Sequence, residues 1–175
     1  MGNLRNYRNL VVRIDELCRR IAAEYGEYLV CGEGCDGCCR HVSVFPVEAV
    51  ALAEALGGLP AEQAAHIRKL ARAASTEDAC PLLENGRCLL YDARPIICRT
   101  HGMPLLIGQE GEKRIDFCPK NFRGVSSIPA VAVINLDLLN ATLATINAVF
   151  STSRRNPAEP EQRRLSIAEA LLLGR

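Results

Sequence analysis

The sequence predicts a mainly α-helical protein, a small helical domain with an irregular cysteine-rich metal-binding loop region and a short β-hairpin. Two observations lead to this prediction. Apolar residues recur at three- and four-residue steps over several long segments, which is the spacing of one face of a helix. Between them lie Gly-, Pro- and Cys-rich stretches that lack this period and contain eight of the nine cysteines. Because 175 residues can bury one core of ordinary size, we expect a single domain over residues 1–175.

The first predicted helix runs from about residue 4 to residue 25. Leu10, Ile14 and Ile21 fall on one face, while arginines and glutamates occupy the other. Gly26 follows the last apolar position and marks the expected end. Cys18 lies on the apolar stripe, so we expect a buried structural thiol there and no metal ligand.

Proline and glycine boundaries place the other helices. Pro46 and Pro60 begin two short Ala-rich helices that Gly57-Gly58 separates, and Pro95 begins a brief one. Together with apolar periodicity, these signals predict helices over residues 46–56, 60–74, 95–98, 129–151 and 161–173. We expect the helix at 129–151 to pack on the first helix, and residues 153–160 to be a polar linker to the C-terminal helix.

Short extended segments are expected in two places. Residues 103–107 and 114–117 flank a polar loop that contains glycine, which predicts a small hairpin. Residues 80–102 are compact and rich in turns, and Asn85-Gly86 signals a tight turn between extended pieces.

Charge and hydropathy exclude several classes of protein. The net charge is +1 and the pI about 7.5, so we expect neither a nucleic-acid partner nor a membrane partner. The N-terminus lacks the apolar core of a signal peptide, and no apolar run reaches the roughly 18 residues that cross a bilayer. We therefore expect a cytoplasmic protein.

The cysteines predict a metal site over residues 31–118. Nine cysteines, an odd number, do not suit a disulfide framework in a reducing compartment. Thiolates are soft ligands that select zinc or iron–sulfur. The candidate metal ligands are the eight in turn-rich segments: Cys31, Cys35, Cys38, Cys39, Cys80, Cys88, Cys98 and Cys118.

The ligands can be grouped in more than one way. Cys31 to Cys39 reads C-x3-C-x2-C-C, a spacing that lets sulfurs converge across a tight loop. The adjacent Cys38 and Cys39 diverge unless the backbone bends, so they serve either one ion or two neighbouring centres. Eight thiolates divide evenly into two four-sulfur sites. Alternatively, four hold one cluster and the others hold a second ion or remain core thiols.

Arginines accompany these cysteines, as a partly buried anionic site requires. Arg94 and Arg99 are the candidates for holding the cluster region from just outside the ligands. We expect them to donate hydrogen bonds to sulfur, to backbone carbonyls or to a carboxylate such as Asp92 or Glu84. Two histidines near cysteines, His41 and His101, are further candidates for nitrogen ligands.

These residues resemble the YkgJ-type cysteine-cluster family. The resemblance covers roughly residues 31–118 and is most specific from Cys80 to Arg99, where Tyr91, Arg94-Pro95 and Cys98-Arg99 are in register. The first cysteine pair encloses three residues, where the family usually has two. The resemblance implies chelation of zinc or iron and, in some relatives, association with an iron–sulfur-dependent protein methylase.

Three functions follow as hypotheses. The preferred one is an iron–sulfur or iron-binding protein in a redox, metal-handling or enzyme-accessory role. The second is a zinc-stabilised module that binds a protein partner. The third is an iron–sulfur-dependent enzyme similar to protein lysine methyltransferases. No glycine-rich nucleotide loop and no Ser–His–Asp arrangement is visible in the sequence, which disfavours a self-contained enzyme with an organic cofactor.

Overall fold

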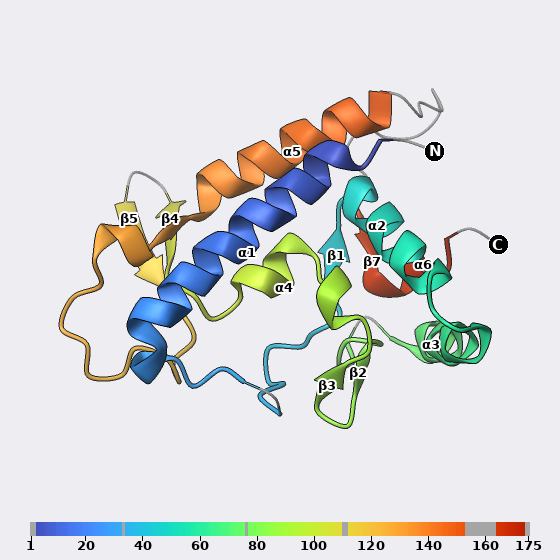
Figure 1. Cartoon of the computed structure of the whole chain (residues 1–175), viewed down its shortest axis with the longest axis horizontal. Helices are drawn as coiled ribbons and strands as arrows, with labels where there is room; N and C mark the ends of the chain where they lie inside the picture. Colours follow the sequence, from blue (N-terminus) through green and yellow to red (C-terminus); the bar gives the residue numbers. More distant parts are fainter. Residues whose placement is uncertain (1–2, 33, 76, 110–111, 153–163, 174–175) are drawn as a thin grey trace.

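The computed structural model describes residues 3–32, 34–75, 77–109, 112–152 and 164–173 (Figure 1). It is mostly helical with small sheets, which confirms the predicted fold class. The helices are α1 (Arg5–Tyr25), α2 (Pro46–Gly57), α3 (Ala61–Ala73), α4 (Ile96–Thr100), α5 (Leu136–Thr152) and α6 (Ile167–Leu171). Single 3-10 turns are η1 (Gly26–Tyr28), η2 (Tyr91–Ala93) and η3 (Ala130–Ala132). The strands are β1 (Ser43–Val44), β2 (Leu83–Glu84), β3 (Arg87–Cys88), β4 (Leu105–Gln109), β5 (Glu112–Asp116), β6 (Ile134–Asn135) and β7 (Leu165–Ser166).

The two long helices, α1 and α5, lie side by side, which confirms the predicted packing (Figure 1). Apolar residues spaced along α1, including Leu10, Ile14 and Ile21, are buried in one cluster with Leu139 and Leu143 of α5. The short helix α4 packs against α1. None of the described helices combines the length and apolar character that crossing a bilayer requires.

A second hydrophobic cluster forms at the other end of the molecule. Helix α6 packs against both α2 and α3, and Leu52, Ile67 and Leu171 are buried there. Leu82 and Leu90, which bracket Cys88 in the sequence, join the same cluster. The second cluster therefore supports the segment that carries Cys80 and Cys88.

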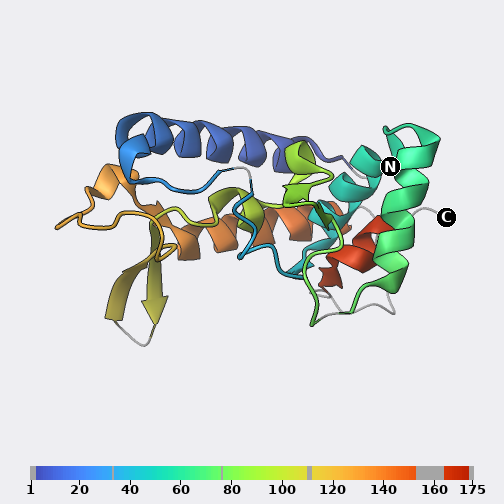
Figure 2. The ribbon, with the colours of Figure 1, turned by 90° about the horizontal axis from the view of Figure 1, so that it is seen from below.

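The predicted hairpin is present as β4 and β5, with Ile107 opposite Arg114. It projects at the end of the molecule away from α3 (Figure 2). Strand β6 adds to β4 in parallel, with Leu105 opposite Ile134, and makes a three-stranded sheet in the order β5-β4-β6.

The prediction that the second long helix begins at residue 129 is wrong. Residues 130–132 form η3, and Ile134–Asn135 pairs with β4, so α5 begins only at Leu136. The Asn135 side chain accepts a hydrogen bond from the Leu138 backbone N–H at 2.9 Å and satisfies a donor of the first turn. A strand and a capping asparagine therefore replace the first two predicted turns.

The helix predicted over 161–173 is not helical in its described residues 164–166. Leu165 and Ser166 pair with Val44 and Ser43, and α6 covers only Ile167–Leu171. Ser166 and Glu169 form a capping box, in which each side chain accepts from the other's backbone N–H, at 3.1 and 2.7 Å. The predicted linker, residues 153–160, lies outside the described residues.

Candidate metal centre

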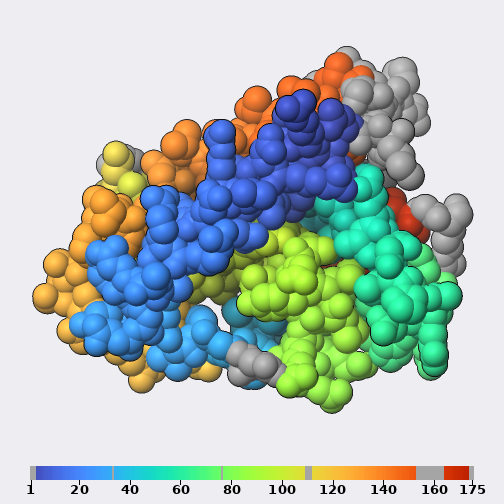
Figure 3. Space-filling model, viewed as in Figure 1, coloured from blue at the N-terminus to red at the C-terminus, as the bar shows by residue number. Residues whose placement is uncertain are grey.

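Seven of the eight candidate cysteines line one cavity of about 660 Å³. They are Cys31, Cys35, Cys38, Cys39, Cys80, Cys88 and Cys98. On the face shown in Figure 3, segment 31–40 in light blue and segment 80–100 in green lie on either side of a hollow. The structure thus brings together cysteines that are up to 67 positions apart in the sequence (98 − 31). All nine cysteines of the chain are free thiols.

Backbone hydrogen bonds join the two segments that supply these thiols. The Cys80 backbone N–H donates to the Cys39 carbonyl at 3.0 Å, and Arg40 forms an isolated β-bridge with Ala79. The β2–β3 hairpin then returns the chain, so that Cys88 pairs with Leu83, whose N–H donates to the Cys80 carbonyl at 2.9 Å. Cys39, Cys80 and Cys88 are therefore held together by main-chain structure.

Cys118, the eighth candidate, lies beside Cys31. Gly102 is between them: a Cβ atom built on it would be 3.0 Å from Cys31 Sγ and 3.6 Å from Cys118 Cβ. The φ angle of Gly102 is +88°, a conformation that favours glycine, and its compactness permits the close approach.

Asn121 fixes the position of Cys31. Its buried side chain donates from Nδ2 to Cys31 Sγ at 3.2 Å and to the Gly102 carbonyl at 2.9 Å. Its Oδ1 accepts from the Val30 N–H at 2.9 Å. Both polar atoms of its side chain thus bond to the backbone or the thiol around Cys31. Next to it in the sequence, Lys120 places Nζ 3.9 Å from Cys35 Sγ.

The thiols surround a space and do not converge on a point. Among the described residues, no three His, Cys, Asp or Glu groups are placed to hold a single ion. The donor set itself fits zinc or iron–sulfur, since soft thiolates are the preferred ligands of both. The arrangement suits either a cluster of several atoms or loops that draw in when metal binds.

Burial and neighbouring thiols raise the pKa of two cysteines that line the cavity, Cys80 and Cys98. Burial raises the pKa of Cys80 to about 11, and the charges of Cys88 and Cys39 also raise it. Burial raises the pKa of Cys98 to about 12, with further increases from Cys80, Cys88 and Cys39 and an opposing effect of Arg94. Metal must therefore displace protons from these thiols on binding.

The pKa of Cys31 is raised for similar reasons. Burial raises the pKa of Cys31, the hydrogen bond from Asn121 opposes it, and the charges of Cys118, Cys35 and Cys38 raise it. Cys31 and Cys98 thus have different sets of neighbouring thiols.

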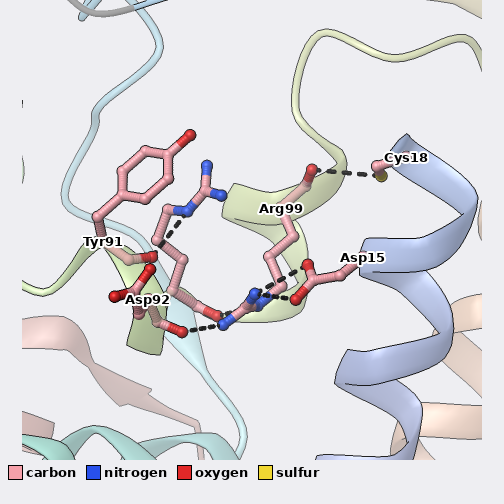
Figure 4. Close-up of polar contacts among 6 residues, drawn as sticks. Asp15, Cys18, Tyr91, Asp92 and Arg99 are labelled. Carbon is pink, nitrogen blue, oxygen red and sulfur yellow. Dashed lines mark hydrogen bonds and ion pairs between the residues drawn. The ribbon is translucent and has the colours of Figure 1, made fainter. Parts of the chain in front are cut away.

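Arg99 holds the cysteine region to the helical core. It leaves α4 and points toward α1, where its Nη1 donates to the Asp15 carboxylate (Figure 4). Its Nε donates to the Arg94 carbonyl at 2.6 Å, and its Nη2 donates to the Asp92 carbonyl. The sequence predicts hydrogen bonds to sulfur, to backbone carbonyls or to a carboxylate such as that of Asp92 or Glu84. Arg99 bonds to two backbone carbonyls and to a different carboxylate, that of Asp15.

Arg94 lies at the wall of the cavity. Its guanidinium stacks on the Tyr91 ring at 3.6 Å, and its Nε donates to the Tyr91 carbonyl at 2.9 Å. Its charge lowers the pKa of Cys98 and Cys88, against the larger effect of burial. Its guanidinium therefore stabilises thiolate charge from a fixed position.

The two candidate histidines differ. His41 uses both ring nitrogens on backbone groups: Nδ1 donates to the Ser75 carbonyl at 2.8 Å, and Nε2 accepts from the Ala168 N–H at 3.2 Å. In this arrangement His41 ties the loop to α6 and offers no nitrogen to a metal. His101 is exposed and lines the cavity.

Cys18 occupies the predicted place on α1, away from the residues that line the cavity. It is partly buried against the α1–α5 core, and its thiol donates to the Arg99 carbonyl at 3.6 Å (Figure 4). It therefore contacts the helix that carries Cys98 without facing the cavity.

Sequence reasoning missed three polar residues that position this region. Asp15 lies on the polar face of α1, where nothing distinguishes it from a solvated carboxylate. Glu48 is buried and accepts from the Ile96 and Phe45 backbone N–H groups, both at 3.0 Å. Asn121 had one signal, its place three residues after Cys118.

The chain was also compared with known proteins. The model of the CxxCxxCC family, described as a "putative zinc- or iron-chelating domain", matches residues 30–119, slightly more than half of the 175-residue chain. No curated protein and no solved structure matches the chain. The matched range contains all eight candidate cysteines together with Arg94 and Arg99. The chain therefore belongs to the CxxCxxCC family.

Proposed function

We propose that this protein binds an iron–sulfur cluster, or iron, and works in a redox, metal-handling or enzyme-accessory role in a reducing compartment such as the cytoplasm. The proposed ligands are Cys31, Cys35, Cys38, Cys39, Cys80, Cys88, Cys98 and Cys118. Arg94 and Arg99 support the site from outside the ligands.

The observation that supports this best is the cavity lined by seven free thiols. Free cysteines are usually buried singly as small apolar residues. Here they border a space of about 660 Å³, and backbone bonds fix the segments around it. Unrelated core thiols would not gather around one opening.

The spread of the thiols around the cavity leaves room for a cluster of several atoms. A single tetrahedral zinc requires four ligands at about 2.3 Å from one point. The described cysteines are spread around the cavity without such a point. A cluster of several iron and sulfide atoms is larger, so its four cysteines stand further apart.

The rim of the cavity supports a role that involves a protein partner. Tyr91 and Ile97 line the opening, and 58% and 49% of their surfaces are exposed. Aromatic and apolar residues beside Arg94 form a surface that suits protein contact. A redox or accessory function needs such access between the metal and a partner.

Anaerobic purification tests the proposal. An iron–sulfur protein would be brown, with broad visible absorption and with iron and acid-labile sulfide in similar amounts. Cys98→Ser should lower both contents, while Cys18→Ser, a substitution away from the cavity, should leave them unchanged. A colourless protein with zinc would favour the zinc-stabilised binding module. Absence of both metals, after purification and after reconstitution, would refute the proposal.

A further inference from the structure

We propose that the eight thiols form two separate four-sulfur centres rather than one. The first centre comprises Cys31, Cys35, Cys38 and Cys118, and the second comprises Cys39, Cys80, Cys88 and Cys98. This inference rests on the proposed function, because it concerns how the same thiols are shared between metal groups.

Ligand number is the first reason. A structural zinc takes four ligands, and both common types of iron–sulfur cluster take four cysteines. Eight thiolates around one such group would leave four of them without metal. Those four would remain at the same cavity as thiols with no metal to hold.

Main-chain structure assembles the second centre. A backbone hydrogen bond joins Cys80 to Cys39, and the β2–β3 hairpin places Cys88 on the same side of that junction. Cys98 lies on α4, and its neighbouring thiols are those whose charges raise its pKa: Cys80, Cys88 and Cys39. The positive charge of Arg94 lowers the pKa of both Cys88 and Cys98, so this centre has its own nearby cation.

A different part of the structure assembles the first centre. Cys31 and Cys118 flank Gly102, and Asn121 donates to Cys31 Sγ. The neighbouring thiols whose charges raise the pKa of Cys31 are Cys118, Cys35 and Cys38. Lys120 lies 3.9 Å from Cys35, so this centre also has a nearby cation, distinct from Arg94.

Cys38 and Cys39 mark the boundary between the centres. Cys38 is exposed, whereas Cys39 is partly buried and its carbonyl accepts from Cys80. The charge of Cys35 also raises the pKa of Cys39, so the two centres would be neighbours. The Cys38 and Cys39 thiols are close enough to hydrogen-bond to each other, so the two centres would adjoin at this pair.

The test measures total iron and zinc per chain in protein purified without oxygen. One variant, Cys31→Ser/Cys35→Ser, damages the first centre, and another, Cys88→Ser/Cys98→Ser, damages the second. With two centres, each variant retains the metal of the intact centre, so their two metal contents add up to the wild-type content. Cys18→Ser is the control and should match wild type.

A second set of variants compares the adjacent Cys38 and Cys39, which the proposal assigns to different centres. In the Cys31→Ser/Cys35→Ser background, adding Cys38→Ser should remove no further metal, whereas adding Cys39→Ser should remove most of the remainder. If both double variants lose all metal while wild type binds it, the chain has one centre and the division is wrong, although the proposed function stands. Equal loss from the added Cys38→Ser and Cys39→Ser would also overturn the division. A wild type without metal would instead refute the proposed function.

Discussion

Asp15 of α1 and Arg99 of α4 are joined by hydrogen bonds from Arg99 Nη1 to both carboxylate oxygens, at 2.8 and 2.6 Å. Only 7% of the Arg99 side chain is exposed. The same guanidinium donates to the carbonyls of Asp92 and Arg94, which precede α4. One side chain therefore couples the α1–α5 core to the turn that positions Cys98.

Arg99→Lys should weaken this coupling, because an ammonium lacks the planar fork that reaches three acceptors. We expect a loss of about 1–3 kcal/mol in the free energy of unfolding. Metal retention should fall by about 10- to 100-fold. Competition with a chelator measures retention. The control is Arg8→Lys, an exposed partner of Glu54, which should cost under about 1 kcal/mol. Unchanged retention in Arg99→Lys would show that this arginine serves a purpose other than metal binding.

Glu48→Ala should destabilise the protein more than Glu54→Ala on the same helix. The Glu48 carboxylate is the acceptor for two buried N–H groups, those of Phe45 and Ile96, and each orphaned donor costs about 1–3 kcal/mol. We expect a loss of about 2 kcal/mol or more in urea unfolding. Glu54 makes an exposed ion pair with Arg8, so its loss should cost little. Equal effects of the two substitutions would refute the anchoring role of Glu48.

Cys18 should make stability depend on pH in the alkaline range. Burial raises its pKa to about 11, while an unfolded thiol titrates near about 8.5. Between these values the unfolded state loses the proton first. The contribution of Cys18 is therefore complete below about pH 8.5 and declines as pH rises toward 11. Urea unfolding of wild type and Cys18→Ala at pH 8 and pH 10 measures this. The stability difference should shrink at the higher pH, and a constant difference would contradict the prediction.

Metal removal should leave most of the helix intact. The two hydrophobic clusters are built mainly from helical Leu, Ile, Val and Ala side chains. The described residues of segment 31–40 contain no helix, and segment 80–98 contains only short elements, so both should lose protection when the thiols are released. Circular dichroism before and after chelation tests the first part, and amide hydrogen exchange tests the second. Complete loss of helix would mean that the core depends on metal.

Gly102→Ala should disturb the surroundings of Cys31 more than Gly124→Ala disturbs its own. Both glycines have positive φ angles, +88° and +77°, so each substitution strains the backbone by about 1–2 kcal/mol. Only at Gly102 would the added methyl group meet Cys31 Sγ, at 3.0 Å, and Asn121 Nδ2, at 3.1 Å. Metal content should therefore fall in Gly102→Ala and hold in Gly124→Ala. Similar contents in both variants would show that crowding at Cys31 has no consequence.

Local patterns predicted most of the helices, because periodicity and proline or glycine boundaries act over a few residues. The α1 stripe and the proline-started α2 are found as predicted. The errors at 134–135 and 165–166 have one cause. Both pairs of residues form short strands, β6 and β7, whose partners β4 and β1 are far away in the sequence. Pairing between distant strands cannot be predicted from a few consecutive residues of the sequence.

The sequence by itself determined the ligand class, since eight cysteines outside the amphipathic helices point to soft-metal chemistry in any fold. It also determined that Arg94 and Arg99 stand beside Cys98. Only the tertiary structure decided that Arg99 bonds to Asp15, 84 residues away, that Asn121 reaches Cys31, and that Cys118 lies by Gly102. The physical reason is range. Residue chemistry and helix periodicity are local properties, whereas the partner of a buried polar group is chosen by how distant segments pack around it.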